Sequence, residues 1–475
     1  MNEENTIFQP VAQLPSEEVL QPALPSQSVP PPPNFPKNPS LNPFSFLKIF
    51  KLIVGGLVLV LAVFVVIRFV IPYFQPAKNE EVKLTYWGLW ENENTMKVII
   101  SDFERQNPKI SLDYSKQDIK QYRERLATRI QNDTGPDIFQ FHNTWLPMFF
   151  NILVPLPENV MPKNEFGKAY YPVVQTDLVK QGAIYGIPIG IDTLSLFVNT
   201  DILKAAGTGV PKTWDEFLTT ARTLTVKNEN GEIKTAGTAM GTFDNITHAP
   251  DIVSLLFVQN GANLNNLSDT LENASEALRF YASFANDEAR VWDETLDPSR
   301  LAFAKGNLAM YFGYSWDIFA IKALNPKLSF EIHPVPALIG RNITIASYFA
   351  NGVSIKGKHT KEALLFMNFL AKRETQQKLF SESSKTRLFG EPYARIDLAN
   401  SLKDNSYVYP FIEQGKSAVS TFFASDTFDN GLNDQMNQYL GNAVRSILGN
   451  TSPQSAIETL ASGVKQVLGR YNEKR

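Results

Sequence analysis

Residues 82–91 read Val-Lys-Leu-Thr-Tyr-Trp-Gly-Leu-Trp-Glu, and the folded part of the chain begins here. Apolar and polar residues alternate up to Trp87, which is the two-residue period of a β-strand. The strand is expected to stop at Gly88, because glycine adopts backbone angles that other residues avoid and lets a ligand or a second backbone come close. At the strand ends of an open α/β sheet, aromatic rings and a carboxylate suit a binding crevice. We therefore expect Trp87 or Trp90, with Glu91, to face such a crevice, and core packing is the alternative for either ring.

The length and composition of the chain limit the class of protein that it can be. A chain of 475 residues is too long for one ordinary domain and favours two lobes. Lysine and arginine number 45 against 48 acidic residues, and this near balance argues against nucleic-acid binding. The absence of cysteine excludes disulfides, thiolate metal sites and a lipid-modified cysteine. The four histidines do not have the spacing of a zinc-hydrolase helix, and we expect no metal and no cofactor.

The first 81 residues differ in character from the rest. Residues 1–48 contain 11 of the 30 prolines, which predicts a disordered, polyproline-like tail. Residues 49–73 are predicted to form a transmembrane helix, since Arg68 is the only charge from Leu52 to Ile71. The tail is too long for the charged start of a signal peptide, so the helix is expected to remain as an anchor, followed by a linker over 74–81. Basic residues flank both sides, and charge alone leaves the orientation open.

Two later predicted strands are followed, like the first, by aromatic and polar side chains. The strand Asp137–Phe141 is followed by His142, Asn143 and Trp145, and the strand Leu308–Phe312 is followed by Tyr314 and Trp316. Parallel strands that end at one edge of a sheet would bring such groups together. No metal-ligand partner accompanies His142 at a suitable spacing, which favours a neutral, hydrogen-bonding histidine.

Asp192 lies between two strand-like runs, 183–189 and 194–199, where the chain is expected to pass from one lobe to the other. Its carboxylate either caps a turn or binds ligand hydroxyls, and the sequence favours neither.

Local signals define several helices and turns. Thr213 and Glu216 have the spacing of a capping box, which predicts a helix start. Residues 226–232 resemble a calcium loop, but Val226 occupies a ligand position, so a hairpin turn at Asn230–Gly231 is the better interpretation. Glu362–Leu379 is predicted to form one long helix, and the chain is expected to end in a helix from Pro453 to Leu468.

Five short motifs occur in the order in which they are found in one family. Residues 82–470 resemble the extracellular solute-binding proteins of carbohydrate ABC importers, the group (family 1) that includes the maltose-binding protein. The motifs are Tyr86–Gly88, Gly135–Ile138, Tyr185–Pro188, Pro211–Phe217 and Phe303–Met310. The resemblance implies an α/β chain with the two-lobed periplasmic-binding-protein type II fold and a hinge, preceded here by one transmembrane helix. The implied lobes are 82–190 with 336–383, and 191–335 with 384–475.

The resemblance also implies a ligand-binding site between the lobes. Aromatic rings would stack on the CH faces of a sugar, while carboxylates and amides would bind its hydroxyls. Core packing or capping is an open alternative for Asp244, Asn245, Tyr348 and Asn351. The expected site residues are Trp87, Trp90, Glu91, His142, Asn143, Trp145, Asp192, Asp244, Asn245, Tyr314, Trp316, Tyr348 and Asn351.

The function implied by the resemblance is delivery of a carbohydrate to the permease subunits of an ABC importer, by a non-enzymatic, monomeric protein that closes about its hinge. The family usually reaches the surface by a cleaved signal peptide, often with a lipidated cysteine, and this chain departs from that pattern. The family places the lobes outside the cell membrane and the tail in the cytoplasm. A glycan-processing enzyme that uses Glu91, Asp192 or Asp244 as paired carboxylates is one alternative, and a ligand-sensing scaffold is the other.

Overall fold

The computed structural model describes residues 43–70, 81–286 and 290–472. It consists of two units, Met1–Lys78 and Asn79–Arg475. Most of the predicted tail and linker lies outside the described residues.

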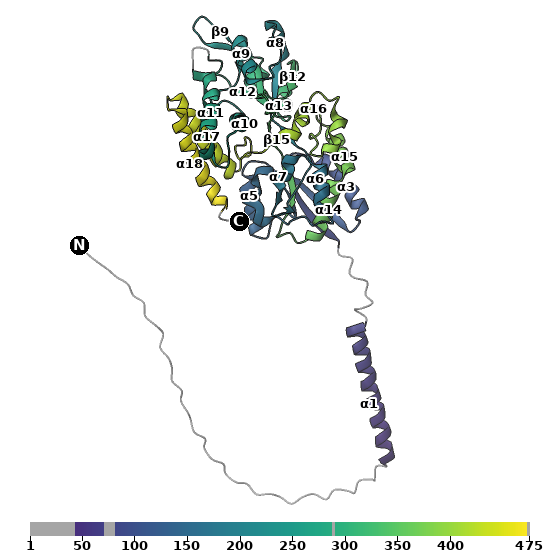
Figure 1. Cartoon of the computed structure of the whole chain (residues 1–475). Helices are drawn as coiled ribbons and strands as arrows, with labels where there is room; N and C mark the ends of the chain where they lie inside the picture. Colours follow the sequence, from purple (N-terminus) through teal and green to yellow (C-terminus); the bar gives the residue numbers. More distant parts are fainter. Residues whose placement is uncertain (1–42, 71–80, 287–289, 473–475) are drawn as a thin grey trace, which may run out of the picture. The chain divides into compact units, whose positions relative to one another are not determined.

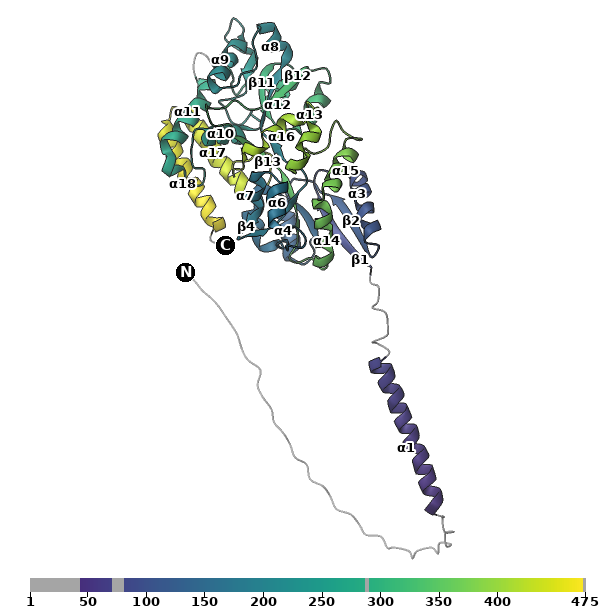
Figure 2. The same cartoon turned by 45° about the vertical axis from the view of Figure 1, so that its right-hand side comes forward.

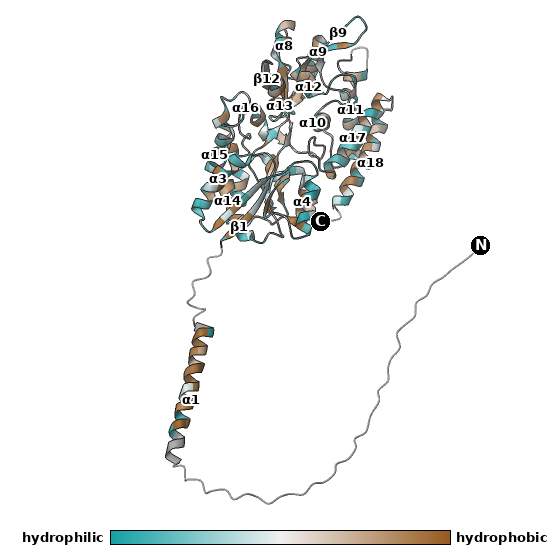
Figure 3. Cartoon of the chain, turned by 180° about the vertical axis from the view of Figure 1, so that it is seen from behind, coloured by the Kyte–Doolittle hydropathy of each residue, from teal (hydrophilic) through white to brown (hydrophobic). Residues whose placement is uncertain are grey.

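The described part of the first unit is one helix. It runs as α1 (Pro43–Val65) and continues as a π-helical turn over Val66–Val70, so it begins within the stretch that we assigned to the tail. Proline suits this first helical position because its missing N–H would have no partner there. The span Lys48–Phe69 has 22 residues and a mean hydropathy of 2.9, with none of it buried. In Figure 3 most of this helix has the colour of hydrophobic residues. Among the described residues it is the one helix long and apolar enough to cross a bilayer.

Lobe 1 of the second unit is built on a five-stranded sheet. Its strand order is β2 (Ile110–Lys116), β1 (Val82–Gly88), β3 (Ile138–His142), β14 (Phe349–Val353) and β6 (Ile187–Pro188). The first three strands are parallel, which confirms that the ends of β1 and β3 lie at one edge, whereas β14 runs antiparallel to its neighbours.

The end of β1 requires glycine for a steric reason. A Cβ atom at Gly88 would lie 2.3 Å from the hydroxyl oxygen of Tyr114 on the neighbouring strand. Along β1, Leu84 and Tyr86 are buried while Lys83 is exposed, as the two-residue period predicts. The close approach at Gly88 is thus to another strand of the sheet.

Lobe 2 is built on a second five-stranded sheet. Its order is β12 (Phe330–His333), β8 (Ser195–Asn199), β11 (Leu308–Gly313), β10 (Ile233–Thr238) and β9 (Val226–Lys227). Strand β9 pairs antiparallel with β10 across the predicted Asn230–Gly231 turn, where Gly231 has a φ of 78°. Helix α9 (Trp214–Leu224) begins with the predicted capping box of Thr213 and Glu216.

A small three-stranded sheet connects the two lobes. It consists of β15 (Ala418–Val419), β13 (Thr344–Ser347) and β7 (Asp192–Thr193). Figure 2 shows β13 between the lobe 2 elements α9 and β11 and the lobe 1 elements β1 and β2. Asp192 therefore lies on a crossing strand, as expected from its position in the sequence.

Helices cover both sheets (Figure 1). Helices α17 and α18 pack along each other and against α11. The remaining helices are α3 (Glu93–Gln106), α4 (Tyr122–Gln131), α5 (Leu146–Phe149), α6 (Lys163–Ala169), α7 (Pro172–Leu178), α8 (Thr200–Ala206), α10 (Ala249–Gln259), α11 (Leu271–Asn286), α12 (Ser299–Ala304), α13 (Asp317–Leu324), α14 (Thr360–Ala371), α15 (Arg373–Ser383), α16 (Tyr409–Glu413), α17 (Leu432–Leu448) and α18 (Pro453–Asn472). A two-stranded ribbon pairs β4 (Val179–Lys180) with β5 (Ala183–Ile184).

One helix prediction was wrong in detail. The stretch Glu362–Leu379 is divided between α14 and α15, because Lys372 has an extended backbone with a ψ of 141°. Both halves are amphipathic, so the apolar pattern alone did not reveal the break.

Candidate functional site

A cavity of about 390 Å³ opens between the two lobes beside the crossing strands. Its size falls within the range of small-molecule sites. Lobe 1, lobe 2 and the crossing strands all contribute side chains. The lining residues are Trp90, Glu91, Ile119, Gln140, His142, Ile189, Gly190, Ile191, Asp192, Arg300, Trp316, Phe319, Ser347, Tyr348, Phe349, Leu379, Arg387, Glu391, Ser425, Asp426 and Phe428.

The lobe 1 wall is formed by the residues that follow β1. The Trp90 ring is 38% exposed and packs edge-to-face on Phe349, with ring centroids 5.2 Å apart. Glu91 is buried, and its Oε2 accepts a hydrogen bond of 2.8 Å from the Ser383 hydroxyl. Burial raises the pKa of Glu91, and the nearby Arg387 opposes this effect.

Arg387 holds two acidic residues of the cavity together. Its Nη2 donates to Glu91 Oε1 at 2.8 Å and to Glu391 Oε1 at 3.1 Å. Its guanidinium lies 5.6 Å from the ring centre of Phe319 in helix α13, a cation–π contact. The buried Nε of Arg387 has no hydrogen-bond partner among the described residues.

His142 ends β3 as a neutral residue. Its Nδ1 lies 2.7 Å from the Thr144 hydroxyl and its Nε2 lies 3.0 Å from the Ser347 hydroxyl. Burial lowers the pKa of His142 to about 3, so the imidazole is uncharged at neutral pH. The ring also packs edge-on against Phe349 at 5.0 Å. These contacts agree with the prediction of a neutral, hydrogen-bonding histidine.

Asp192 links the crossing strand to lobe 2. Its Oδ2 accepts hydrogen bonds from the backbone N–H of Ser315 at 2.9 Å and from the Ser315 hydroxyl. Its Oδ1 accepts from the backbone N–H of Thr193 at 3.0 Å. Burial raises the pKa of Asp192, and the bonds from Ser315 oppose the rise. The carboxylate thus caps the turn after β11 while its residue lines the cavity.

The lobe 2 wall is a stacked pair of aromatic rings. Trp316 lies parallel to Tyr314, with ring centroids 4.4 Å apart and an interplanar angle of 15°. Tyr314 is buried behind it, and its hydroxyl donates to Asp251 Oδ1 at 2.8 Å. Trp316 therefore presents one face to the cavity from a rigid support.

A group of charges lies next to this platform, with His248 and Asp317 buried and Arg300 partly exposed at the cavity. His248 Nε2 is 2.7 Å from Asp317 Oδ2, and Arg300 Nη1 donates to Asp317 Oδ1 at 3.0 Å. Burial alone would lower the pKa of His248, but the adjacent Asp317 carboxylate raises it to about 9. The His248 imidazole is therefore charged at neutral pH. Its Nδ1 lies 2.7 Å from the hydroxyl of Ser425, which lines the cavity.

The structure brings some of the predicted site residues to this cavity. They come from the end of β1, the end of β3, the crossing strands and the turn after β11. The predicted residues that line the cavity are Trp90, Glu91, His142, Asp192, Trp316 and Tyr348. Tyr314 supports the wall from behind.

Three other predicted residues belong to lobe 1 but not to this cavity. Trp87 packs on Tyr122 at 6.5 Å, and Trp145 is fully buried among aromatic rings. The Asn351 amide is also fully buried, where its Oδ1 accepts a 2.5 Å hydrogen bond from Tyr86. For Trp145 and Asn351 the structure corrects the expectation of a binding role, because their side chains are enclosed by the core.

The remaining predicted residues lie outside the cavity lining. Asn143 lines a second cavity. Asp244 is exposed and pairs with Arg445 at 2.8 Å. The Asn245 amide holds its own loop, donating to the Asp293 carbonyl and accepting from the Trp292 indole. The side chains of Asp244 and Asn245 are thus engaged by surface or loop contacts, and a binding role for them stays a prediction.

Several lining residues were not found from the sequence. Arg387 is 296 positions from its partner Glu91, and no local pattern connects them. Asp426 and Phe428 lie in an irregular loop and have positive φ angles of 55° and 47°. A non-glycine residue in the left-handed region is uncommon and often occurs at functional sites, but the sequence does not reveal the angle. Within the described ranges, no three histidine, aspartate or glutamate side chains gather as a metal site would require.

Two sheets joined by short crossing strands, with a cavity between the lobes, define the class of two-lobed ligand-binding proteins of periplasmic-binding-protein type II. The family model for the bacterial extracellular solute-binding protein matches residues 90–377, and the chain belongs to this family. This finding confirms the resemblance seen in the sequence.

Individual relatives agree with this assignment. The multiple sugar-binding protein of Streptococcus mutans is 26% identical over 325 residues, which cover 64% of this chain and 74% of that protein. A cyclo/maltodextrin-binding protein solved with maltotetraose has a TM-score of 0.67 at 19% identity, over 83% of this chain and 98% of that one. The sugar-binding protein MalE of Xanthomonas citri has a TM-score of 0.67 at 20% identity, over 82% of this chain and 98% of that one. These two structures establish the fold.

Proposed function

We propose that the protein binds a carbohydrate in the cavity between its lobes and delivers it to an ABC importer. The observation that carries this proposal is the composition of the cavity, where Trp90 and Trp316 lie on walls from different lobes and carboxylates lie beside them. Sugar rings have apolar CH faces that stack on aromatic rings and hydroxyls that bind carboxylates. The relatives described above, a multiple sugar-binding protein and a cyclo/maltodextrin-binding protein, support the same ligand class.

The cavity residues have distinct roles in this proposal. Trp316 is the main stacking surface, because Tyr314 fixes its ring from behind. Arg387 lines the cavity and holds the carboxylates of Glu91 and Glu391 in place. Glu91 and Asp192 accept ligand hydroxyls in addition to the bonds that hold them. Asp426 and Phe428, which sequence reasoning missed, complete the lobe 2 side.

We propose that ligand binding is coupled to closure about the crossing strands β7, β13 and β15. A ligand that contacts both walls would favour the closed arrangement, since it interacts with each lobe only partly when they are apart. Arg123 in α4 donates to the Asp429 carbonyl at 2.6 Å, so a direct contact joins α4 of lobe 1 to the loop before α17. The lobe boundaries expected from the sequence remain a prediction.

We further propose that helix α1 anchors the protein in the cell membrane as a single pass. The length and hydropathy of Lys48–Phe69 support this, and so does the extracellular character of the family. The binding lobes would then lie outside and the tail in the cytoplasm, with the permease subunits of the importer as partners of the monomer.

Binding without chemical conversion is the favoured activity. Glycoside hydrolysis needs two carboxyl groups free to act on the bond. Of the carboxylates considered for catalysis, two line this cavity, and both are engaged: Glu91 pairs with Arg387, and both oxygens of Asp192 accept hydrogen bonds from the chain. We therefore expect a bound sugar to be recovered unchanged after long incubation with the protein, as chromatography would measure.

The test is calorimetric titration of the full chain, in a detergent without sugar groups, with a panel of mono- and oligosaccharides. At least one sugar should bind saturably, and Trp316→Ala should weaken that binding by about tenfold, equivalent to about 1.4 kcal/mol. Ile339→Ala is the control, since this side chain is 97% exposed and does not line the cavity. If no sugar gives heat or raises the melting temperature, the carbohydrate proposal fails.

A further inference from the structure

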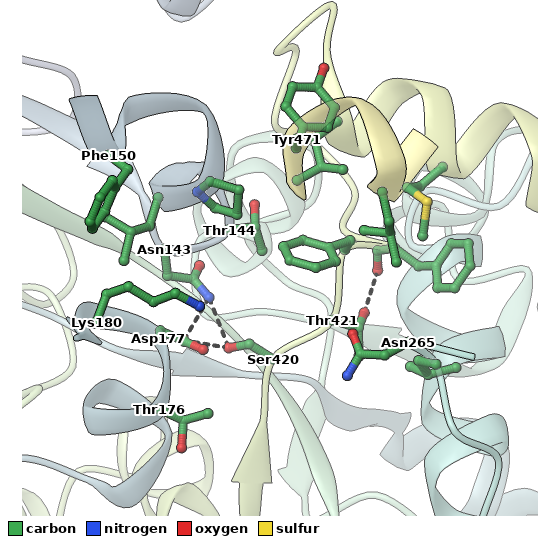
Figure 4. A pocket seen from close by; sticks show the side chains of 18 residues that line it. Asn143, Thr144, Phe150, Thr176, Asp177, Lys180, Asn265, Ser420, Thr421 and Tyr471 are labelled. Carbon is green, nitrogen blue, oxygen red and sulfur yellow. Dashed lines mark hydrogen bonds between the residues drawn. The ribbon is translucent and has the colours of Figure 1, made fainter. Parts of the chain in front are cut away.

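A second cavity of about 500 Å³ lies against the other side of the same connecting segments. His142 lines the first cavity, while the next residue, Asn143, lines the second. Tyr348 lines the first cavity, and its hydroxyl donates to Asp177 in the second at 2.7 Å. Figure 4 shows the second cavity, with polar side chains gathered around Asp177 and aromatic and apolar side chains opposite.

The polar wall is built around one carboxylate oxygen. Oδ2 of Asp177 accepts hydrogen bonds from Ser420 at 2.6 Å, Tyr348 at 2.7 Å and Asn143 at 2.9 Å. The Asn143 amide also donates to the Ser420 hydroxyl at 2.8 Å, so the cluster is internally ordered. All three of these bonds reach Oδ2, and Oδ1 is the second acceptor atom of the same carboxylate. This wall therefore offers a positioned acceptor to a ligand that donates.

The charge and shape of the second cavity limit the class of ligand that it can bind. Lys180 lines the same wall, as Figure 4 shows, so the site carries one carboxylate and one ammonium group and does not select for net charge. The opposite wall contains Phe422 and Tyr471, both partly exposed, with Leu468 of α18, while Phe150 lies on the side of Lys180 (Figure 4). A ring that is apolar on its faces and bears hydroxyls at its edge matches both walls.

We infer that this second cavity is a binding site for a small, neutral, polyhydroxylated molecule such as a sugar ring. A hydroxyl of the ligand donates to Asp177 Oδ1, and its apolar face packs on Tyr471 and Phe422. The choice of ligand class rests on the proposed function, whereas the existence of the site rests on the cavity and its ordered polar cluster.

The two cavities must be separated in the test, because Tyr348 contributes to both. Trp316→Ala removes the stacking surface of the first cavity and touches nothing in the second. Asp177→Asn preserves the shape of the second cavity but removes its charge. Asp215→Asn is the matched control, since Asp215 is an exposed carboxylate at the start of α9.

The experiment is saturation-transfer NMR on the full chain in an amine-oxide detergent, with glucose, maltose and choline as probes. In the Trp316→Ala background, glucose or maltose should still bind saturably. Adding Asp177→Asn should weaken that binding at least tenfold, adding Tyr471→Ala should weaken it as well, and adding Asp215→Asn should leave it unchanged. Melting temperatures establish that each variant is folded.

Three results overturn the inference. Sugar binding that survives Asp177→Asn unchanged places the ligand elsewhere, and binding of choline in place of the sugars contradicts the ligand class. If the unsubstituted chain binds sugar but Trp316→Ala abolishes all binding, there is no second site, while the proposed function stands. If the unsubstituted chain binds no sugar, the proposed function fails.

Discussion

The two walls of the cleft are supported in different ways, as their histidines show. In lobe 1, His142 is buried among hydroxyl groups, and burial lowers its pKa to about 3. In lobe 2, His248 is equally buried but lies 2.7 Å from the Asp317 carboxylate, and its pKa is raised to about 9. The same residue type is thus neutral on one side of the cavity and cationic on the other.

The difference shows what each wall depends on. When one partner is removed from a neutral hydrogen-bonded wall, the protein loses the net stabilisation of one hydrogen bond. If the remaining polar group stays buried without a partner, the protein also bears the cost of that unsatisfied group. A buried ionic wall loses more, because removing one charge leaves its partner uncompensated in a medium of low polarity. We therefore expect the lobe 2 wall to be the more sensitive to single substitutions and to alkaline pH.

The largest effect is expected from Asp317→Ala. It leaves His248 and Arg300 without their shared counter-charge, and breaking a buried pair of this kind costs about 3–5 kcal/mol. Denaturant unfolding of the full chain, followed by tryptophan fluorescence, measures the change. Asp297→Ala is the control, because its pair with Lys305 is largely exposed and is expected to contribute at most about 1 kcal/mol. Equal losses in the two variants would show that the lobe 2 charges are not a buried network.

The pH dependence of stability should differ between the two histidines. For His248, whose folded pKa of about 9 exceeds the unfolded value, the contribution to stability is complete below about pH 6.5 and is lost as the pH rises through 9. For His142, whose folded pKa of about 3 is depressed, stability is lost as the pH falls from about 6.5 towards 3. The change is on the order of 3 kcal/mol for His248 and on the order of 5 kcal/mol for His142.

The matching measurement is unfolding free energy against pH for His248→Gln and His142→Gln. The first substitution should flatten the alkaline side of the profile and the second the acidic side. A profile in which either variant changes the opposite side would contradict the assigned charges.

A smaller loss is expected in lobe 1 from Tyr86→Phe. This change leaves the buried Asn351 Oδ1 without its donor, which should cost about 1–3 kcal/mol of stability. Sugar affinity should remain unchanged, because neither residue lines the cavity. The control variant is Tyr409→Phe, because the Tyr409 hydroxyl has no hydrogen bond within the described part of the chain. A loss of sugar affinity in Tyr86→Phe but not in Tyr409→Phe would indicate that Asn351 contributes to ligand binding.

Local signals in the sequence were sufficient for much of the fold. The alternation along β1, the capping box of Thr213 and Glu216, and the turn at Asn230–Gly231 depend on residues within a few positions of one another. The break at Lys372 was missed because both flanking segments continue the helical pattern. Local patterns therefore predict the elements better than their exact ends.

The site was harder to predict because its contacts join distant segments. Glu91 meets Arg387 and Asp192 meets Ser315, 296 and 123 positions away. A polar residue of a strand can also turn towards the core, as Asn351 does, or towards the cavity, as Ser347 does. The sequence placed aromatic and polar groups near the cleft, but tertiary packing selects which of them line it.

The smallest effect is expected from Asp244→Ala. This substitution removes an exposed ion pair, and its effect is to be compared with the loss of the buried ion pair at Asp317 in the same lobe. Asp244 accepts two hydrogen bonds from Arg445, but the side chains of Asp244 and Arg445 are 68% and 41% exposed. Water screens such a pair, so stability should change by at most about 1 kcal/mol. Affinity for the cleft ligand should not change, since Asp244 does not line the cavity. Calorimetric titration and denaturant unfolding measure the two quantities, and Asp215→Ala, an exposed carboxylate on α9, is the control. A tenfold loss of sugar affinity in Asp244→Ala alone would mean that this carboxylate reaches the ligand when the lobes close.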